Sequence, residues 1–438
     1  MEEIGRHDGR DGSYWMVLDG EVYDVSEFVA DHPGGRLITL AAGRQATSLF
    51  ESYHLGASLP RARRVLACRA RHLGGLVVSQ REPAGDPAFF EAVRHRVSAV
   101  LADRGLDPHA RRWMVGAEAI VVVGLFLLVW GLRLWFGSYL AAVAGGLLLG
   151  RLGFLMHSGN HAGVSRRSAR NAAVGGLMDV IGGSSYVWQM EHQVAHHGKP
   201  NVYGHDNDCE IAAPVLRFHP AQPRRPWHRV QVVVLGVALS IGLVKWLVSD
   251  FVHLAQRRVG NVEFHTSRTI WCRIVALKAL WVAMHVVIPI VVLGPLTGLA
   301  TTVVMMAVGS YYTEGIFIVN HLQRGLVPPD DVHWAQQQVL GTCNWRGGSH
   351  WANVVSGGLN HQIEHHLFPG MSFHLYPTIA PVVRQTCEEF GLPYRNYRGF
   401  VPALLGTVSY LHQLGRAPKD CRVPDFPGGE AATGSPPG

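Results

Sequence analysis

Charged residues are scarce in this 438-residue chain. Asp, Glu, Lys and Arg together make up 16% of the sequence, whereas apolar residues make up 48%. A soluble domain usually carries about 25% charged residues, so an ordinary water-soluble globule is disfavoured. The balance indicates that part of the chain lies in a membrane.

Cysteine is sparse as well, and no two cysteines form a C-x-x-C pair. This absence excludes a zinc site built on paired cysteines and argues against a disulfide framework. We expect reduced thiols and soluble parts that face the cytoplasm. The six cysteines are Cys68, Cys209, Cys272, Cys343, Cys387 and Cys421.

The first 15 residues contain no apolar run, so we expect no secretory signal and insertion through internal segments. Charge is uneven along the chain. Residues 1–60 contain ten acidic residues and four arginines, a net charge of −6, which leaves +13 for the rest. The arginine clusters of the rest flank apolar segments, which favours anionic lipids and an acidic protein partner over nucleic acid. We expect the acidic N-terminal part to dock on the basic remainder.

The sequence predicts a small soluble domain followed by a helical membrane domain. Short strand-like and helical runs alternate between residues 14 and 70, as in a small α+β domain. A polar, Pro-containing stretch at 79–86 then indicates a linker. We therefore expect a soluble domain, a linker, an all-α membrane domain and a disordered tail, at residues 8–78, 79–109, 110–422 and 423–438.

Four apolar stretches approach the roughly 20 residues that a helix needs to span a bilayer. Short links join the first stretch to the second and the third to the fourth, so we expect two helical hairpins. Arginines such as Arg111, Arg166, Arg268 and Arg324 flank the hairpins, and the positive-inside rule places these ends in the cytoplasm. The stretches are Met114–Leu134, Tyr139–Met156, Ala276–Leu293 and Leu299–Val319.

A fifth apolar stretch, Val230–Val248, contains Lys245 and follows basic residues. If it crossed the membrane, the histidine clusters on either side of it would lie on opposite faces. We therefore expect an interfacial or re-entrant helix here.

Seven of the 25 histidines fall into three clusters. His157 and His161 in HSGNH are four residues apart, so a helix would project both from one face. With the expected topology, all clusters meet at the cytoplasmic end of the helices, where eight imidazoles suffice for two metal ions. The other clusters are His192, His196 and His197 in HQVAHHGKP, and His365 and His366 beside Gln362 in HQIEHHLFP. His321 in IVNHL, at the end of the fourth apolar stretch, joins them as an eighth histidine.

Acidic residues near these clusters are candidates to support the ligands, because metal-bound imidazoles usually donate their second N–H to a carboxylate or carbonyl. The candidates are Glu191, Asp206, Asp208 and Glu364. Four further histidines do not have the spacing from other histidines that defines the clusters, and we expect structural roles for them. They are His285, His350, His361 and His374.

Residues 14–70 resemble the cytochrome b5 family. VYDVSEFVADHPGG followed by AAGRQATSLFESYH matches its His-Pro-Gly-Gly loop and a second histidine about twenty residues later. The resemblance implies haem b held by His32 and His54, with Gly34 and Gly35 letting the loop turn at the haem edge. Gln45 stands where the family usually has an acidic residue, which should not affect ligation.

Residues from about 110 to 400 resemble membrane fatty-acid desaturases with three histidine boxes, most specifically in GGLNHQIEHHLFP. Gln362 in place of the first histidine of the third box, together with a fused b5 domain, is typical of front-end desaturases. These enzymes act between an existing double bond and the carboxyl end. The resemblance implies a di-iron centre held by the eight clustered histidines, with Gln362 at the box position. Ser158 stands where the family usually has Asp, so weaker support of His157 or His161 is expected.

Imidazole suits iron, copper, zinc and nickel, but an adjoining haem electron donor favours iron, because oxygen activation needs electrons and zinc does not. The resemblance implies O2-dependent desaturation of an acyl chain carried by coenzyme A or a lipid. Electrons would come from an NAD(P)H-dependent reductase. A sphingoid long-chain-base desaturase and a di-iron acyl hydroxylase remain open, as does a non-catalytic membrane haem protein that only carries electrons.

Overall fold

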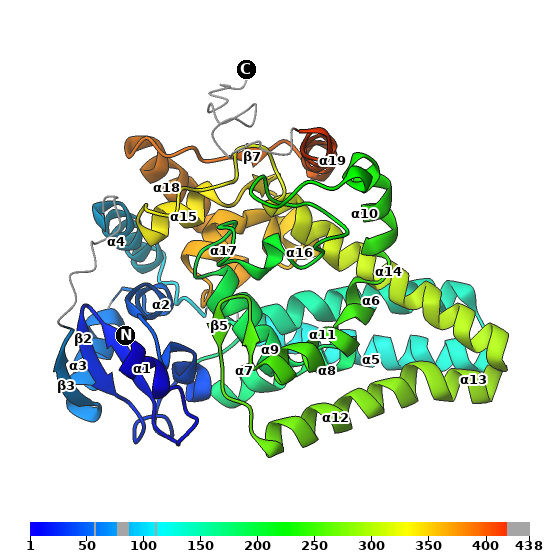
Figure 1. Cartoon of the computed structure of the whole chain (residues 1–438), viewed down its shortest axis with the longest axis horizontal. Coiled ribbons are helices and arrows are strands. Elements are labelled where there is room, and N and C mark those ends of the chain that lie inside the picture. The colour runs from blue at the N-terminus through cyan, green and yellow to red at the C-terminus, as the bar shows by residue number, and fades with distance from the viewer. Residues whose placement is uncertain (57, 77–86, 110–111, 418–438) are drawn as a thin grey trace.

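The computed structural model describes residues 1–56, 58–76, 87–109 and 112–417. The expected tail 423–438 and the Pro-containing stretch 79–86 lie outside the described residues. The chain folds into a small α+β domain at the N-terminal side and a larger, mostly helical part (Figure 1).

The small domain is built on a three-stranded antiparallel sheet in the order β1-β2-β3. Met16, Leu18, Val25 and Phe28 fill its core together with Leu66 of the last helix. Its strands are β1 (Trp15–Leu18), β2 (Glu21–Asp24) and β3 (Arg71–Gly75). Its helices are α1 (Glu2–Arg6), η1 (Gly35–Ala41), α2 (Thr47–Tyr53) and α3 (Ser58–Arg69).

Helix α4 (Pro87–Asp103) occupies most of the segment that the sequence suggested as a linker. Its residues Phe89, Phe90, Val93 and Val97 are buried in the core of the larger part, where α4 packs on α18 (Tyr376–Glu389). Their spacing gives one apolar face at helical period, a signal that the neighbouring proline and polar residues obscured.

Four long helices of the larger part are apolar and long enough to cross a membrane, which confirms the number expected. Helix α5 packs on α6, α6 on α14, and α13 on α14. The helices are α5 (Arg112–Phe136), α6 (Tyr139–Asn160), α12 (Arg268–Val282) continued through the π-helical turn η5 (Ala283–Val287) into α13 (Ile288–Leu293), and α14 (Pro295–His321).

Small residues let these helices approach closely, as in membrane bundles. A Cβ on Gly146 of α6 would meet the carbonyl oxygen of Met305 at 2.5 Å, and one on Gly150 would meet the ring of Tyr312 at 2.5 Å. The outer faces are apolar and open: Leu140 is 80% exposed and Leu296 is 84% exposed. Only a lipid or another apolar partner would cover such faces.

The fifth apolar stretch forms two helices rather than one. Helix α10 (Gln231–Leu239), preceded by η4 (Pro226–Val230), meets α11 (Gly242–Gln256) at an angle of 91°. The amide N–H of Leu243 donates to the hydroxyl of Ser310 at 3.0 Å. The charge on Lys245 faces Glu314 of α14 at 3.4 Å, so α11 is tied to the long helices.

Short helices gather at one end of the long ones (Figure 1). The first group, which follows α6, is α7 (Ser168–Gly175), α8 (Leu177–Ile181), α9 (Ser185–Trp188), the π-helix η2 (Gln189–His196) and η3 (Asn207–Cys209). The second group, which follows α14, is α15 (Trp334–Leu340), α16 (His350–Val355), η6 (Leu359–His361), α17 (Gln362–Leu367), η7 (Phe373–Leu375), α18 and α19 (Phe400–Arg416). The remaining pairings are β4 (Arg258–Val259) with β5 (Val262–Glu263) and β6 (Asn344–Trp345) with β7 (Asn396–Tyr397).

Candidate metal centre

The first histidine pair lies at the end of α6. His157 is in the last turn and His161 directly follows the helix, with their ring centroids 4.7 Å apart. Gly159 between them abuts the backbone of Gly175, and no Cβ would fit there. The side chain of Asn160 donates to the carbonyl of Gly175 at 3.3 Å. The contact with α7 thus fixes where α6 ends and where its histidines point.

The second cluster lies on a π-helix. The N–H of His197 donates to the carbonyl of His192 at 2.9 Å, an i to i+5 bond. A π-helix places residues five apart on one face, so Nε2 of His192 and Nε2 of His197 approach to 3.2 Å. The ring of His196 lies 5.1 Å from that of His192 and 4.5 Å from that of His321. Such π-helical turns occur frequently at functional sites.

The third cluster divides its two histidines between two positions. His365 and His366 are neighbours on α17, so their side chains leave the helix about 100° apart. Nε2 of His365 lies 3.1 Å from Nε2 of His197. The ring of His366 instead lies 5.1 Å from that of His321, at the end of α14.

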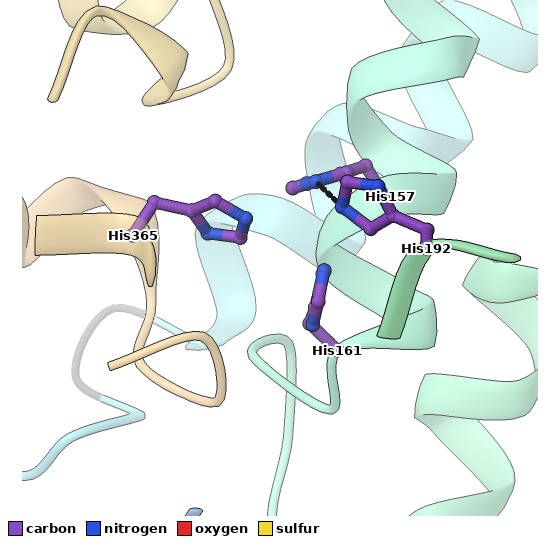
Figure 2. A group of neighbouring side chains, drawn as sticks. All are labelled: His157, His161, His192 and His365. Carbon is purple, nitrogen blue, oxygen red and sulfur yellow. Dashed lines mark hydrogen bonds between the residues drawn. The ribbon is translucent and has the colours of Figure 1, made fainter. Parts of the chain in front are cut away.

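The eight histidines form two buried groups. In the first, ring nitrogens of four residues lie within 4.8 Å of one another, and Figure 2 shows them converging from three elements. The second group contains three residues at the same spacing. His197 connects the groups, because it touches His192 and His365 and its ring stacks on His366 at 4.2 Å. The first group is His157, His161, His192 and His365, and the second is His196, His321 and His366.

Four of the eight rings, those of His161, His196, His365 and His366, are tied by hydrogen bonds through Nδ1. His196 donates to Asp206 at 2.9 Å and His366 donates to Gln338 Oε1 at 2.9 Å. Nε2 of His161 and Nε2 of His366 are buried and have no hydrogen-bond partner among the described residues. Buried nitrogens without partners, on rings whose opposite nitrogen is held by a hydrogen bond, are typical of metal ligands. The residues therefore fit a pair of metal ions.

Burial sets the protonation of this cluster. It lowers the pKa of His192, His197 and His366 well below the ordinary histidine value, and the neighbouring imidazoles lower it further. Burial acts on His196 in the same direction, but Asp206 and Asp208 outweigh it and raise its pKa to about 9. Most of the imidazoles are thus neutral at pH 7, which is the form that binds metals.

Of the four acids expected to support the ligands, Asp206 is the one with a close ligand contact. It also accepts the N–H of Asn201 at 2.7 Å, while Asp208 lies 3.4 Å from His196. The other two acids have hydrogen-bond partners other than the clustered histidines among the described residues. Glu364 accepts from Asn344 Nδ2 at 2.8 Å and from Tyr394 at 2.7 Å, and Glu191 accepts from Asn207 Nδ2 at 2.9 Å.

Sequence reasoning missed the neutral supporting residues. Tyr53 and Gln338 lie far from the boxes in sequence, Tyr376 follows His365 by eleven residues, and nothing in their local pattern marks them. The hydroxyl of Tyr376 lies 3.2 Å from Nδ1 of His365. Gln362 lies inside the site, with its amide 2.9 Å from Nε2 of His321. Ser158 turns to the backbone carbonyl of Phe154 at 3.3 Å and supports no histidine.

A second pair of histidines faces one another in the small domain. The rings of His32 and His54 lie 6.5 Å apart. Nδ1 of His32 donates to Gly35 O at 3.2 Å and Nδ1 of His54 to Phe50 O at 2.7 Å, so each Nε2 is left for a metal. A Cβ on Gly34 would meet the ring of His32 at 2.8 Å, and Gly35 has φ +62°. These two residues fit the pair of imidazoles that would hold a haem iron.

The small domain docks beside the metal centre mainly through apolar contacts. Leu37, Leu40 and Leu49 pack with Val187, Met190 and Phe264 of the larger part. The small domain contributes a positive charge to one ion pair and a negative charge to another. Its Arg10 pairs with Glu263 at 2.9 Å, and its Glu51 pairs with Arg94 at 3.2 Å. The described contacts therefore differ from the expected docking of an acidic domain on a basic surface.

Comparison with known proteins matches both parts of the chain. Residues 134–398 match the model of the family described as fatty acid desaturase, and residues 1–75 match the cytochrome b5-like heme/steroid binding domain. An acyl-lipid (8-3)-desaturase of Physcomitrium patens is 30% identical over 95% of this chain and 91% of its own length.

Two further relatives cover most of the chain. A chloroplastic acyl-lipid (7-3)-desaturase of Chlamydomonas reinhardtii is 31% identical over 91% of this chain and 80% of its own length. An acyl-lipid (8-3)-desaturase of Mortierella alpina is 27% identical over 96% of this chain and 97% of its own length.

Proposed function

The chain belongs to the fatty acid desaturase family and carries a cytochrome b5-like domain, and on that premise we propose that it is a front-end acyl desaturase. It would insert a double bond between an existing one and the carboxyl end of a fatty-acyl chain. The observation that carries the proposal is the convergence of two histidine groups at the end of four apolar helices, beside a docked haem domain.

We assign one iron to the group of His157, His161, His192 and His365, and the other to that of His196, His321 and His366. His197 lies between them, and Gln362 supports His321. A saturated methylene has no acidic proton for a general base to remove. The irons, when bound, supply the activation of O2 that the reaction needs.

The protein's own residues hold and isolate this centre. All eight histidines are buried, which excludes bulk water. The carboxylate of Asp206 holds the Nδ1 proton of His196, and the phenol of Tyr376 holds that of His365, so both rings keep their orientation. The rings of Trp188 and Phe317 lie 5.5 and 5.7 Å from that of His157 and wall the site.

The remaining assignments complete the proposal. His32 and His54 hold haem b, with Gly34 and Gly35 at its edge, and an NAD(P)H-dependent reductase supplies the electrons. Residues 8–78 form the haem domain, 79–109 connect it and include helix α4, and 110–422 form the desaturase domain. The long helices form two membrane hairpins, with the haem domain and the short helices on the cytoplasmic side.

Product analysis tests the proposal. We would express the chain in a host that lacks polyunsaturated lipids, feed linoleic acid, and locate double bonds by mass spectrometry. A new double bond on the carboxyl side of the existing ones is the expected result. A hydroxylated acid, or new unsaturation confined to long-chain bases, would contradict it.

A matched pair of variants separates catalysis from electron carriage. Replacing His196 and His197 with Ala should abolish the product and leave the haem spectrum intact. Replacing His350, an exposed histidine outside both groups, should change neither. Unchanged product in the double variant would contradict the assignment of the metal site.

A further inference from the structure

Tyr53 of the small domain reaches the metal centre of the larger one. It is the last residue of α2, directly before His54. Its hydroxyl oxygen lies 2.8 Å from Nδ1 of His161, and the two rings lie nearly parallel at 23°. Gly370, three residues after α17, gives it space, since a Cβ there would meet the Tyr53 ring at 2.9 Å. Packing therefore holds the phenol against the histidine.

The contact determines which nitrogen of His161 faces the site. Nε2 is buried without a hydrogen-bond partner among the described residues. If Nε2 presents its lone pair to a metal, the ring proton must be on Nδ1, which then donates to the Tyr53 oxygen. Tyr376 plays the same part for His365. The difference is that Tyr53 comes from another domain.

We propose that the haem domain completes the metal centre, with Tyr53 as the positioning residue of His161. The inference rests on the proposed function, because it takes the first histidine group to be an iron site. It also accounts for Ser158, which leaves the first box without a supporting carboxylate. Apolar contacts of Leu37 and Leu40 keep the domain docked, so iron retention and domain docking are coupled.

The test is the full-length Tyr53→Phe variant, loaded with iron-57 and challenged with a chelator. We expect non-haem iron to fall from two per chain toward one, because losing such an outer partner weakens metal binding roughly 10- to 100-fold. One of the two Mössbauer subspectra should disappear while the haem absorption stays unchanged. The control is Tyr23→Phe, since Tyr23 lies on β2 in the same domain and its ring contacts His72.

Three results would overturn the inference. Two irons with unchanged subspectra in Tyr53→Phe would show that the phenol does not position His161. Loss of haem together with iron would show that Tyr53 supports the fold of the haem domain instead. Wild-type protein without non-haem iron would overturn the proposed function as well, which distinguishes the two failures.

A separate observation concerns a groove on the membrane-facing side of the larger part. It has a volume of about 850 Å³ and is lined by Leu147 of α6, by α14 from Val308 to Ile316, and by α16 and α19. These α14 residues span eight positions, about 12 Å along the helix. The walls are almost entirely apolar, apart from Arg346 and Arg398 at the rim.

The groove carries positive charge at its edge. Trp345 lines it and is 5% exposed. Arg346 and Arg398 are exposed, and guanidinium groups suit phosphate oxygens. Two aromatic side chains separate the groove from the metal centre: Phe154 contacts Tyr312 at 5.2 Å, and Phe317 lies 5.7 Å from His157.

The structure assigns this groove to a membrane phospholipid, whose tail lies along α14 and whose phosphate meets the two arginines. The apolar walls continue into lipid-facing surface such as Leu147 and Val401, so the occupant enters from the membrane.

The test titrates linoleoyl phosphatidylcholine into the detergent-solubilised, full-length protein and counts bound lipid by native mass spectrometry. Arg346→Gln with Arg398→Gln should weaken binding at least about tenfold, because each variant removes a charged hydrogen-bond donor. Arg257→Gln with Arg258→Gln removes the same charge from exposed positions outside the groove and should leave binding unchanged.

Equal phospholipid binding in both double variants would overturn the assignment. So would selective loss of linoleoyl-coenzyme A binding, since that would assign the arginines to a soluble thioester. A chain that binds phospholipid through these arginines but forms no desaturated product would leave the groove standing and refute the proposed function.

Discussion

Replacing Asp206 with Asn tests how strongly an outer carboxylate holds the second histidine group. The carboxylate accepts three hydrogen bonds: from His196 Nδ1 at 2.9 Å, from the N–H of Asn201 at 2.7 Å, and from the N–H of Asp208 at 3.0 Å. It is fully buried. An amide has one accepting oxygen and no charge, so at least one of these buried donors loses its acceptor.

The magnitude follows from these contacts. A hydrogen bond to a charged group contributes about 1.5–3 kcal/mol, or roughly 10- to 150-fold in an equilibrium constant. We therefore expect Asp206→Asn to lose iron from the group of His196, His321 and His366 at least tenfold more readily. The assay is non-haem iron per chain by mass spectrometry after a graded chelator challenge.

Asp208→Asn is the matched control. Its side chain is 43% exposed and lies 3.4 Å from His196 Nδ1, a longer contact than the 2.9 Å of Asp206, so we expect a smaller effect, about threefold or less. The reasoning is refuted if the two variants retain iron equally well, or if Asp206→Asn releases iron from both groups while the haem remains bound.

Three further predictions concern the fold and the haem. Gly159→Ala should lower the yield of iron-loaded protein several-fold, because Gly175 leaves no room for a Cβ, whereas Gly124→Ala meets nothing within 4 Å and should be neutral; iron content of the purified chains decides. His54→Ala should abolish the haem absorption and retain both non-haem irons, which a spectrum and a metal count report. Burial raises the pKa of Asp179 from 3.8 to about 6, so its ionisation costs up to about 3 kcal/mol of stability, a cost that develops as pH rises between these values. Asp179→Asn should accordingly raise the thermal midpoint at pH 8 and leave it unchanged at pH 3.5.

The sequence could predict those features for which the length of an apolar run or the spacing of residues allows one structural interpretation. An apolar run of about twenty residues is a candidate membrane helix whatever surrounds it, and all four such runs were found. The resemblance to a desaturase fused to cytochrome b5 is confirmed by the two family matches. His157 and His161 also lie together, as predicted, because residues four positions apart on a helix lie on the same face.

Other features depend on contacts between distant segments. The division of His365 and His366 between two groups depends on where α14 and η2 lie, which no local pattern contains. The π-helix at His192 was not predicted either, because its i to i+5 hydrogen bonds depend on the surrounding packing. Tyr53 could not be predicted as a partner of His161, because the two residues meet at the interface between the domains and no sequence motif contains both.

The ratio of metals in the purified protein tests the central claim most directly. Iron-57 loading, Mössbauer spectroscopy and a haem assay on the same sample would give this ratio. Two non-haem irons for each haem, lost together when His192 and His197 are replaced, is the predicted result. A single non-haem metal, or zinc in place of iron, would contradict a two-iron centre built from the two histidine groups.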